Sequence, residues 1–119
     1  MYVPERRGGS RIRAYRPVRL HLPSSPRLLE TLTKDLSVGG VCCITSMPFP
    51  VSTQLNIELV LSSGEGPVSA RGRAVWFRNI PHSDQFDIGI SFSEIPDDDR
   101  RRLSVYLNRL AQKYPLIPA

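Results

Sequence analysis

The sequence contains almost no lysine. Of its 16 basic residues only Lys34 and Lys113 are lysines, and the other fourteen are arginines. A chain that needs charge only for solubility can use either residue, whereas the planar guanidinium fork matches phosphate oxygens and the edge of guanine. A GC-rich coding sequence would produce the same excess of arginine. Recognition of an anionic ligand and a bias of the coding sequence therefore both remain open from composition alone.

Cysteine is also scarce, and its placement excludes two common uses. Cys42 and Cys43 are adjacent, so an extended strand would direct them to opposite faces. A disulfide between neighbours would be strained, and two sulfurs make no zinc site without further ligands. Neither His21 nor His82 lies at metal-ligand spacing from them. We expect one buried and one outward-facing thiol in a reducing compartment, with no metal.

Long apolar runs and catalytic motifs are missing as well. No run approaches the ~18 residues of a membrane span, and the opening residues 1–7 lack the apolar core of a signal peptide. The sequence holds no nucleophile–base set, no HExxH motif and no P-loop, and Asp97–Asp99 fits an exposed helix start rather than a carboxylate pair in a pocket. We therefore expect a cytosolic, non-enzymatic protein without a cofactor and without membrane insertion.

The positive charge is concentrated at the N-terminal end. The 119 residues carry a net charge of +5 and suit one domain, and 40% of them are hydrophobic, which is enough for a core. Through Lys34 there are eight cations against two carboxylates, so this part carries +6 and the remainder −1. A focused anion site or a nucleic-acid arm would need such a distribution.

The apolar pattern predicts an all-β barrel followed by one helix. Residues 1–13 are rich in arginine and glycine and are predicted to form a flexible arm, which leaves 14–119 as the folded domain. About six short segments then alternate apolar and polar residues, with no helical segment between them. A closed six-stranded antiparallel barrel removes the exposed edges of such a sheet. In the long strand around 68–77, alternation places Trp76 on the same face as Val68 and Ala74.

A C-terminal helix is predicted over about 97–113. Pro96 suits the first turn, and three aspartates, Asp97–Asp99, lie where the helix dipole favours anions. Arginines 100–102 follow at helical spacing, so we expect them to pair with these aspartates rather than form a second anion site. An apolar stripe is expected to dock on the barrel. Its members are Leu103, Tyr106, Leu107, Leu110 and Tyr114.

Two short polar clusters carry the candidate chemistry. Arg7 and Arg11 can converge on a small ligand, because each guanidinium can take a phosphate or the O6/N7 edge of guanine. In the run Asp35-Leu36-Ser37-Val38-Gly39-Gly40, the carboxylate can accept the paired N1–H and N2–H donors of guanine, and the hydroxyl can bond a phosphate or a base. The two glycines permit positive φ and close approach to an oxyanion. The same run also fits an ordinary turn whose Asp and Ser bond their own backbone.

These clusters, in this order, resemble the signature of PilZ domains, the bacterial receptors for the second messenger cyclic di-GMP. That signature is RxxxR in an N-terminal arm, here Arg7 to Arg11, followed by [D/N]xSxxG, here Asp35 to Gly40. Further similarity lies in Gly72-Arg73-Ala74-Val75-Trp76 and in Asp87-Ile88-Gly89-Ile90-Ser91-Phe92. The resemblance covers nearly the whole chain, and it implies a six-stranded antiparallel barrel with a C-terminal helix.

The resemblance also implies roles for individual residues. Arg7 and Arg11 would hold phosphates and guanine, and the turn would hold the other side of the ligand through Asp35, Ser37, Gly39 and Gly40. An additional arginine before the motif, here Arg6, is associated in the family with an intercalated pair of cyclic di-GMP molecules. Flanking candidates are Arg13, Trp76 and Arg78, and Trp76 fits a core position under the helix equally well. A ligand-ordered arm would then signal to a downstream protein partner.

Two other functions remain open. Small arginine-rich barrels can bind single-stranded nucleic acid, but they need basic residues spread over a groove and several exposed aromatics. Here the charge concentrates in the arm, and most aromatics fall at predicted core positions. The second alternative is a PilZ-like domain that binds no nucleotide and only docks a partner protein.

Overall fold

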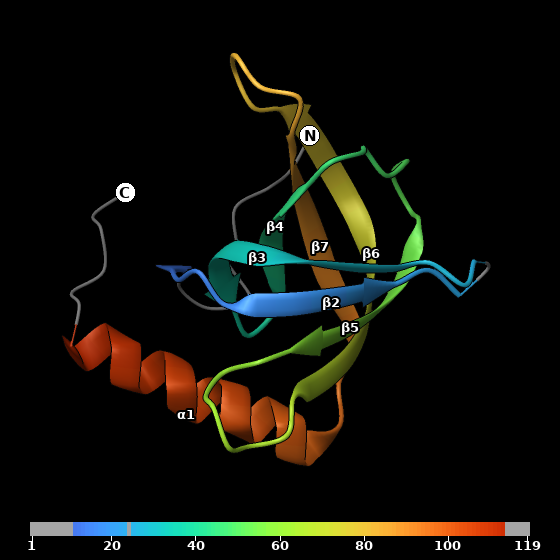
Figure 1. The fold of residues 1–119 in the computed structure, drawn as a ribbon. Helices are drawn as coiled ribbons and strands as arrows, with labels where there is room; N and C mark the ends of the chain where they lie inside the picture. The colour runs from blue at the N-terminus through green and yellow to red at the C-terminus, as the bar shows by residue number, and fades with distance from the viewer. Residues whose placement is uncertain (1–10, 24, 114–119) are drawn as a thin grey trace.

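A computed structural model describes residues 11–23 and 25–113 as a β-barrel with one helix (Figure 1). Arg6 and Arg7 lie outside the described residues. The elements, in chain order, are β1 (Ile12–Arg13), β2 (Pro17–His21), β3 (Leu28–Ser37), β4 (Gly40–Thr45), β5 (Gln54–Leu59), β6 (Val68–Asn79), β7 (Phe86–Glu94) and α1 (Asp97–Lys113).

The barrel closes through antiparallel pairs alone. Its strands follow the order β3-β2-β5-β6-β7-β4, and β4 pairs back onto β3. The predicted six-stranded antiparallel barrel is therefore confirmed, with β1 as a short additional strand. Ile12 and Arg13, which were assigned to the arm, pair with Leu36 and Asp35 of β3. This contact brings the end of the arm to the strand that carries the Asp35 motif.

Alternating side chains fill the interior of the barrel. Leu20 and Ile88 are completely buried, and each lies between outward-facing neighbours on its strand; Leu59, at the end of β5, is equally buried. Because successive residues of a strand face opposite sides, the same alternation that builds the core determines which residues face outward. On β3, β4 and β7 the core positions Leu36, Val41 and Ile90 therefore direct their neighbours onto the outer surface.

The strand register shifts at three points, and two of these β-bulges change which predicted site residues reach the outer surface. One lies in β3 between Thr33 and Asp35, and the other in β6 between Ala74 and Trp76. Ala74 pairs with the buried Ile90, whereas Trp76 pairs with Gly89, the outward neighbour. The prediction that Trp76 shares the face of Ala74 is wrong, because the extra residue of the bulge turns it to the outside.

Helix α1 packs across one end of the barrel, at the bottom of the view in Figure 1, while the β6–β7 loop projects at the top. Leu103 and Leu107 enter the core. Two of the three arginines form the predicted ion pairs, with Arg101 3.3 Å from Asp98 and Arg102 3.6 Å from Asp99. Within the described residues, no helix has the length and apolar character required to cross a membrane.

Candidate functional site

The Asp35 motif lies on the outer face of five neighbouring strands. Register pairs connect one residue of each strand across this face, and directly opposite residues of antiparallel strands share a face. We call this set the outer row: Arg13 (β1), Asp35 (β3), Cys42 (β4), Gly89 (β7) and Trp76 (β6). Three of its members, Arg13, Asp35 and Trp76, are predicted site residues. Barrel closure brings them together although they are up to 63 positions apart in the sequence.

Asp35 and Arg11 form a bidentate ion pair. Arg11 Nε donates to Oδ1 at 3.1 Å, and Nη2 donates to Oδ1 at 2.9 Å and to Oδ2 at 2.8 Å. Both side chains are roughly three-quarters buried. The second arginine of the predicted RxxxR motif and the acidic residue of the second motif thus meet directly. Charge-assisted forks of this kind hold both groups in a defined geometry.

Ser37 and the glycines shape the turn between β3 and β4. Ser37 Oγ accepts from Gly39 N–H at 3.2 Å and donates to the Gly40 carbonyl at 3.5 Å, and the residue is buried. Gly40 does not adopt positive φ, contrary to the proposed reason for a glycine there. A Cβ at this position would lie 2.3 Å from the Ile90 carbonyl oxygen, so Gly40 is needed for close approach of β4 to β7. In the structure the Ser37 hydroxyl therefore makes its hydrogen bonds within the turn itself.

The Trp76 side chain packs against β7 at Gly89. A Cβ on Gly89 would lie 2.0 Å from the indole Nε1, so the missing side chain of Gly89 provides the space for the ring. The Arg78 guanidinium carbon lies 5.5 Å from the centre of the Trp76 ring, within the range of a cation–π contact. Trp76 thus borders the signature residues on the outer face instead of packing as a core residue beneath α1.

Lys34 and Asp87 were not predicted as site residues, yet both lie on the outer face. Lys34 Nζ donates to Asp87 Oδ1 at 3.0 Å, and Arg78 Nε donates to Oδ2 at 3.2 Å. Lys34 precedes Asp35, so strict alternation would place these two on opposite faces. The bulge in β3 places both outside. The sequence offered a signal for Asp87, because it is a carboxylate between Phe86 and Ile88 in an apolar alternating run.

Cys42 lies between these groups. We expected one buried and one outward-facing thiol; Cys42 does face outward, but both cysteines are buried and Cys42 is only 4% exposed. The pKa of the Cys42 thiol is raised to about 12, chiefly by burial and then by the Asp35 and Asp87 carboxylates, whereas Lys34 and Arg11 act in the opposite direction. The two acid–base pairs therefore border the same sulfur. In the described part of the chain, no three potential metal ligands come together.

This thiol should make stability depend on alkaline pH. An unfolded cysteine ionises near pH 8.5, while folded Cys42 keeps its proton until about pH 12. The unfolded state therefore binds fewer protons in this window, and folding stability decreases as the pH rises from about 9 towards 12. One thiol contributes a slope of about 1.4 kcal/mol per pH unit. In urea unfolding at pH 9 and 10, the free energy of unfolding should fall with pH less steeply in Cys42→Ala than in wild type, by about this amount, while at pH 7 the thiol adds almost no slope. Equal pH slopes in variant and wild type above pH 9 would contradict the assignment.

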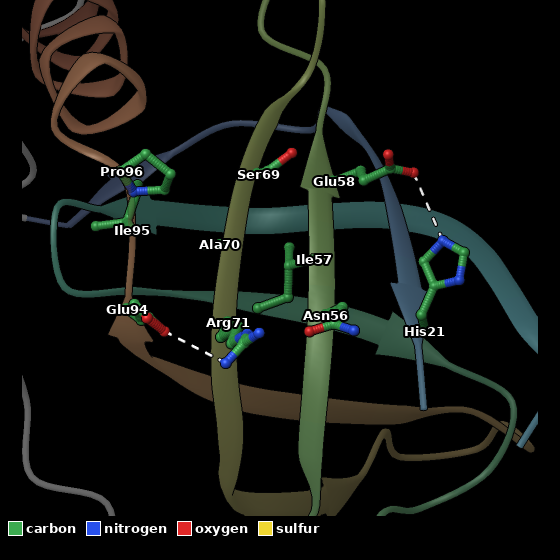
Figure 2. Close-up of a pocket in the computed structure, with 10 residues that line it drawn as sticks. All are labelled: His21, Asn56, Ile57, Glu58, Ser69, Ala70, Arg71, Glu94, Ile95 and Pro96. Carbon is green, nitrogen blue, oxygen red and sulfur yellow. Dashed lines mark hydrogen bonds and ion pairs between the residues drawn. The ribbon is translucent and has the colours of Figure 1, made fainter. Parts of the chain in front are cut away.

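A separate cavity of about 650 Å³ lies on the outer face of β2, β5 and β6 (Figure 2). Its charged groups already pair with each other, since His21 Nε2 lies 3.6 Å from Glu58 Oε1 and Arg71 Nη1 lies 3.5 Å from Glu94 Oε1. No predicted site residue that the structure describes lines this cavity. With both signs of charge present and balanced, it lacks the excess of donors that a nucleotide phosphate requires.

Comparison with known proteins identifies the family. The family model for the PilZ domain matches residues 5–109. The chain belongs to the PilZ domain family. None of the curated proteins gives a significant match.

Solved structures of PilZ proteins share the fold. The Bacillus subtilis inhibitor of motility (MotI/DgrA) superposes with a TM-score of 0.79 at 21% identity, over 92% of this chain and 53% of that one. The PilZ domain of YcgR from Escherichia coli, solved with c-di-GMP, superposes with a TM-score of 0.68 at 17% identity, over 92% of this chain and 97% of that one. The MrkH–c-di-GMP complex of K. pneumonia superposes with a TM-score of 0.74 at 19% identity, over 93% of this chain and 54% of that one. The chain thus spans about half the length of MotI/DgrA and of MrkH and nearly all of the isolated YcgR domain.

Proposed function

We propose that this PilZ domain is a receptor for cyclic di-GMP. The observation that carries the proposal is the direct meeting of Arg11 and Asp35 on the outer row, because it unites the two halves of the family signature. Membership of the PilZ family supports the same conclusion. Two of the similar structures, the YcgR domain and MrkH, were solved with c-di-GMP.

The Arg11 fork shows what Asp35 is suited to accept. A guanidinium presents two parallel N–H groups to a carboxylate, and the N1–H and N2–H groups of guanine present the same pattern. A guanine base that binds Asp35 must therefore take the place of the Arg11 fork. The released Arg11 can then turn to a ligand phosphate or to the O6/N7 edge of guanine. Binding becomes an exchange of one two-donor partner for another.

This exchange would link the ligand to the arm. Arg11 directly precedes β1, so movement of its side chain affects the end of the predicted arm. Arg6 and Arg7 would add cations to the same ligand, and a third arginine in the arm fits an intercalated pair of ligand molecules. Ordering the arm over the outer row would change the surface available to a downstream protein partner. The entropy lost by the arm is offset by the new charge-assisted contacts.

Calorimetric titration with cyclic di-GMP tests the receptor function. We expect saturable heat at micromolar protein with a stoichiometry near two ligands per chain, and displacement of the ligand by neither GMP nor short RNA at equal concentration. A folded protein that gives no heat would refute the receptor and favour a domain that only docks a partner. Equal competition by short RNA would favour single-stranded nucleic-acid binding instead.

A further inference from the structure

Asp87 holds two cations from different strands on the outer face. Its side chain is only 4% exposed, and each carboxylate oxygen takes one donor, Oδ1 from Lys34 and Oδ2 from Arg78. Two cations on the two oxygens of one carboxylate must lie close to each other. Asp87 offsets their repulsion only in part, so the three groups together carry a charge of +1.

The two cations keep donors that Asp87 does not use. Lys34 has three N–H donors and Arg78 has five, and the recorded contacts with Asp87 take one from each. The side chain of Arg78 is 70% exposed and that of Lys34 is 34% exposed, so these donors can reach a ligand from solvent. The Trp76 ring beneath Arg78 restricts the guanidinium further. The donors are thus accessible and already positioned, which lowers the entropy cost of binding an anion.

This pair of cations borders the signature residues. Lys34 directly precedes Asp35, and Arg78 lies two residues after Trp76 of the outer row. Arg78 pairs with Asp87 two residues along β6 and β7 from the pair formed by Trp76 and Gly89, so it lies on the same outer face, about 7 Å from the outer row. A ligand that places guanine at Asp35 can therefore extend its sugar–phosphate ring to Lys34 and Arg78.

We propose that Lys34 and Arg78, positioned by the buried Asp87, form a second anion subsite that binds a phosphate of the cyclic dinucleotide. This inference rests on the proposed receptor function. Neither Lys34 nor Asp87 belongs to the RxxxR or the DxSxxG motif, so the subsite extends the site beyond the signature. Asp87 acts as a positioning residue, because it touches the two cations and not the ligand.

Charge-neutral variants of the two cations test the subsite. We expect Lys34→Gln and Arg78→Gln each to weaken cyclic di-GMP binding about tenfold, since hydrogen bonds to a charged group carry roughly this much free energy. Both should also reduce the dependence of affinity on salt concentration. Arg71→Gln is the matched control, because Arg71 lies on the same strand, is 72% exposed and pairs with Glu94 away from the outer row. It should remain within twofold of wild type.

Guanosine separates a phosphate contact from a base contact. In NMR titrations, cyclic di-GMP should shift the Arg78 Nε–H resonance, whereas guanosine, which has no phosphate, should leave it unchanged. A shift of this resonance by guanosine alone would overturn the phosphate assignment. Wild-type binding with unchanged affinity in both Gln variants would overturn the subsite and leave the receptor function intact. No binding by wild type would refute the receptor function and this subsite with it.

Discussion

Asp35→Asn should lower the affinity for cyclic di-GMP about 100-fold in calorimetric titrations. An amide in place of the carboxylate offers guanine one acceptor and one donor, so the second N–H of the base meets another donor. The charge that strengthens both hydrogen bonds is also lost. Such bonds contribute about 1.5–3 kcal/mol each, but the variant also weakens the Arg11 fork that guanine must replace, and this compensates part of the loss.

A ligand without the exocyclic amine of guanine tests whether Asp35 accepts a hydrogen bond from that amine. The cyclic dinucleotide of inosine lacks this amine, and we expect wild type to bind it about tenfold more weakly than cyclic di-GMP. In Asp35→Asn the two ligands should bind alike, because the acceptor for the amine has gone. Asp84→Asn, an exposed change of the same charge in the β6–β7 loop, serves as the control and should behave as wild type. A tenfold preference for guanine that survives in Asp35→Asn would place the base elsewhere.

Gly40→Ala should destabilise the fold by about 2–3 kcal/mol in urea unfolding without any ligand. The new methyl group would lie 2.3 Å from the Ile90 carbonyl oxygen and 3.3 Å from the Ser91 Cα, both of them backbone atoms. Backbone cannot rotate away as a flexible side chain can, so β4 and β7 must separate at the Gly40–Ser91 pair. Overpacking of this kind costs about 1–3 kcal/mol, and here it also strains ladder hydrogen bonds.

Gly66→Ala is the matched control for this change. Gly66 lies in the β5–β6 loop with nothing within 4 Å of the added methyl group, and its φ lies outside the left-handed region. Its unfolding free energy should stay within about 0.5 kcal/mol of wild type. If Gly40→Ala were as stable as Gly66→Ala and lost only ligand affinity, the glycine of the signature would serve the ligand rather than the strand pairing.

The barrel was predictable because the alternation of apolar residues indicates the strands, and a sheet of such strands needs to close. Apolar residues at every second position indicate strands with one buried face, and a run of such strands without helices needs closure to protect its edges. The helix bounds were predictable for the same local reason. Pro96 and the three aspartates mark its start, and the stripe that includes Leu103 and Leu107 continues at helical spacing.

The wider site was less predictable, because two bulges decide it. Sequence patterns find alternation well, but nothing in the local residue types marks where one extra residue is inserted. The bulge in β3 brings Lys34 to the same face as Asp35, and the bulge in β6 turns Trp76 away from the core. The inward assignment of Trp76 follows from extending strict alternation across its bulge, and the same extension would place Lys34 on the face opposite to Asp35.

By itself the sequence determined the charged end of the chain, the strand pattern, the helix and the two signature motifs, because each depends on neighbouring residue types. Only the tertiary structure decided which motif residues meet. Pairing of β1 with β3 places Arg11 on Asp35, and pairing of β4 with β7 places Asp87 on the same outer face and leaves Gly40 no room for a side chain. These contacts join residues far apart in the chain, so they depend on strand register, which the local pattern does not specify across bulges.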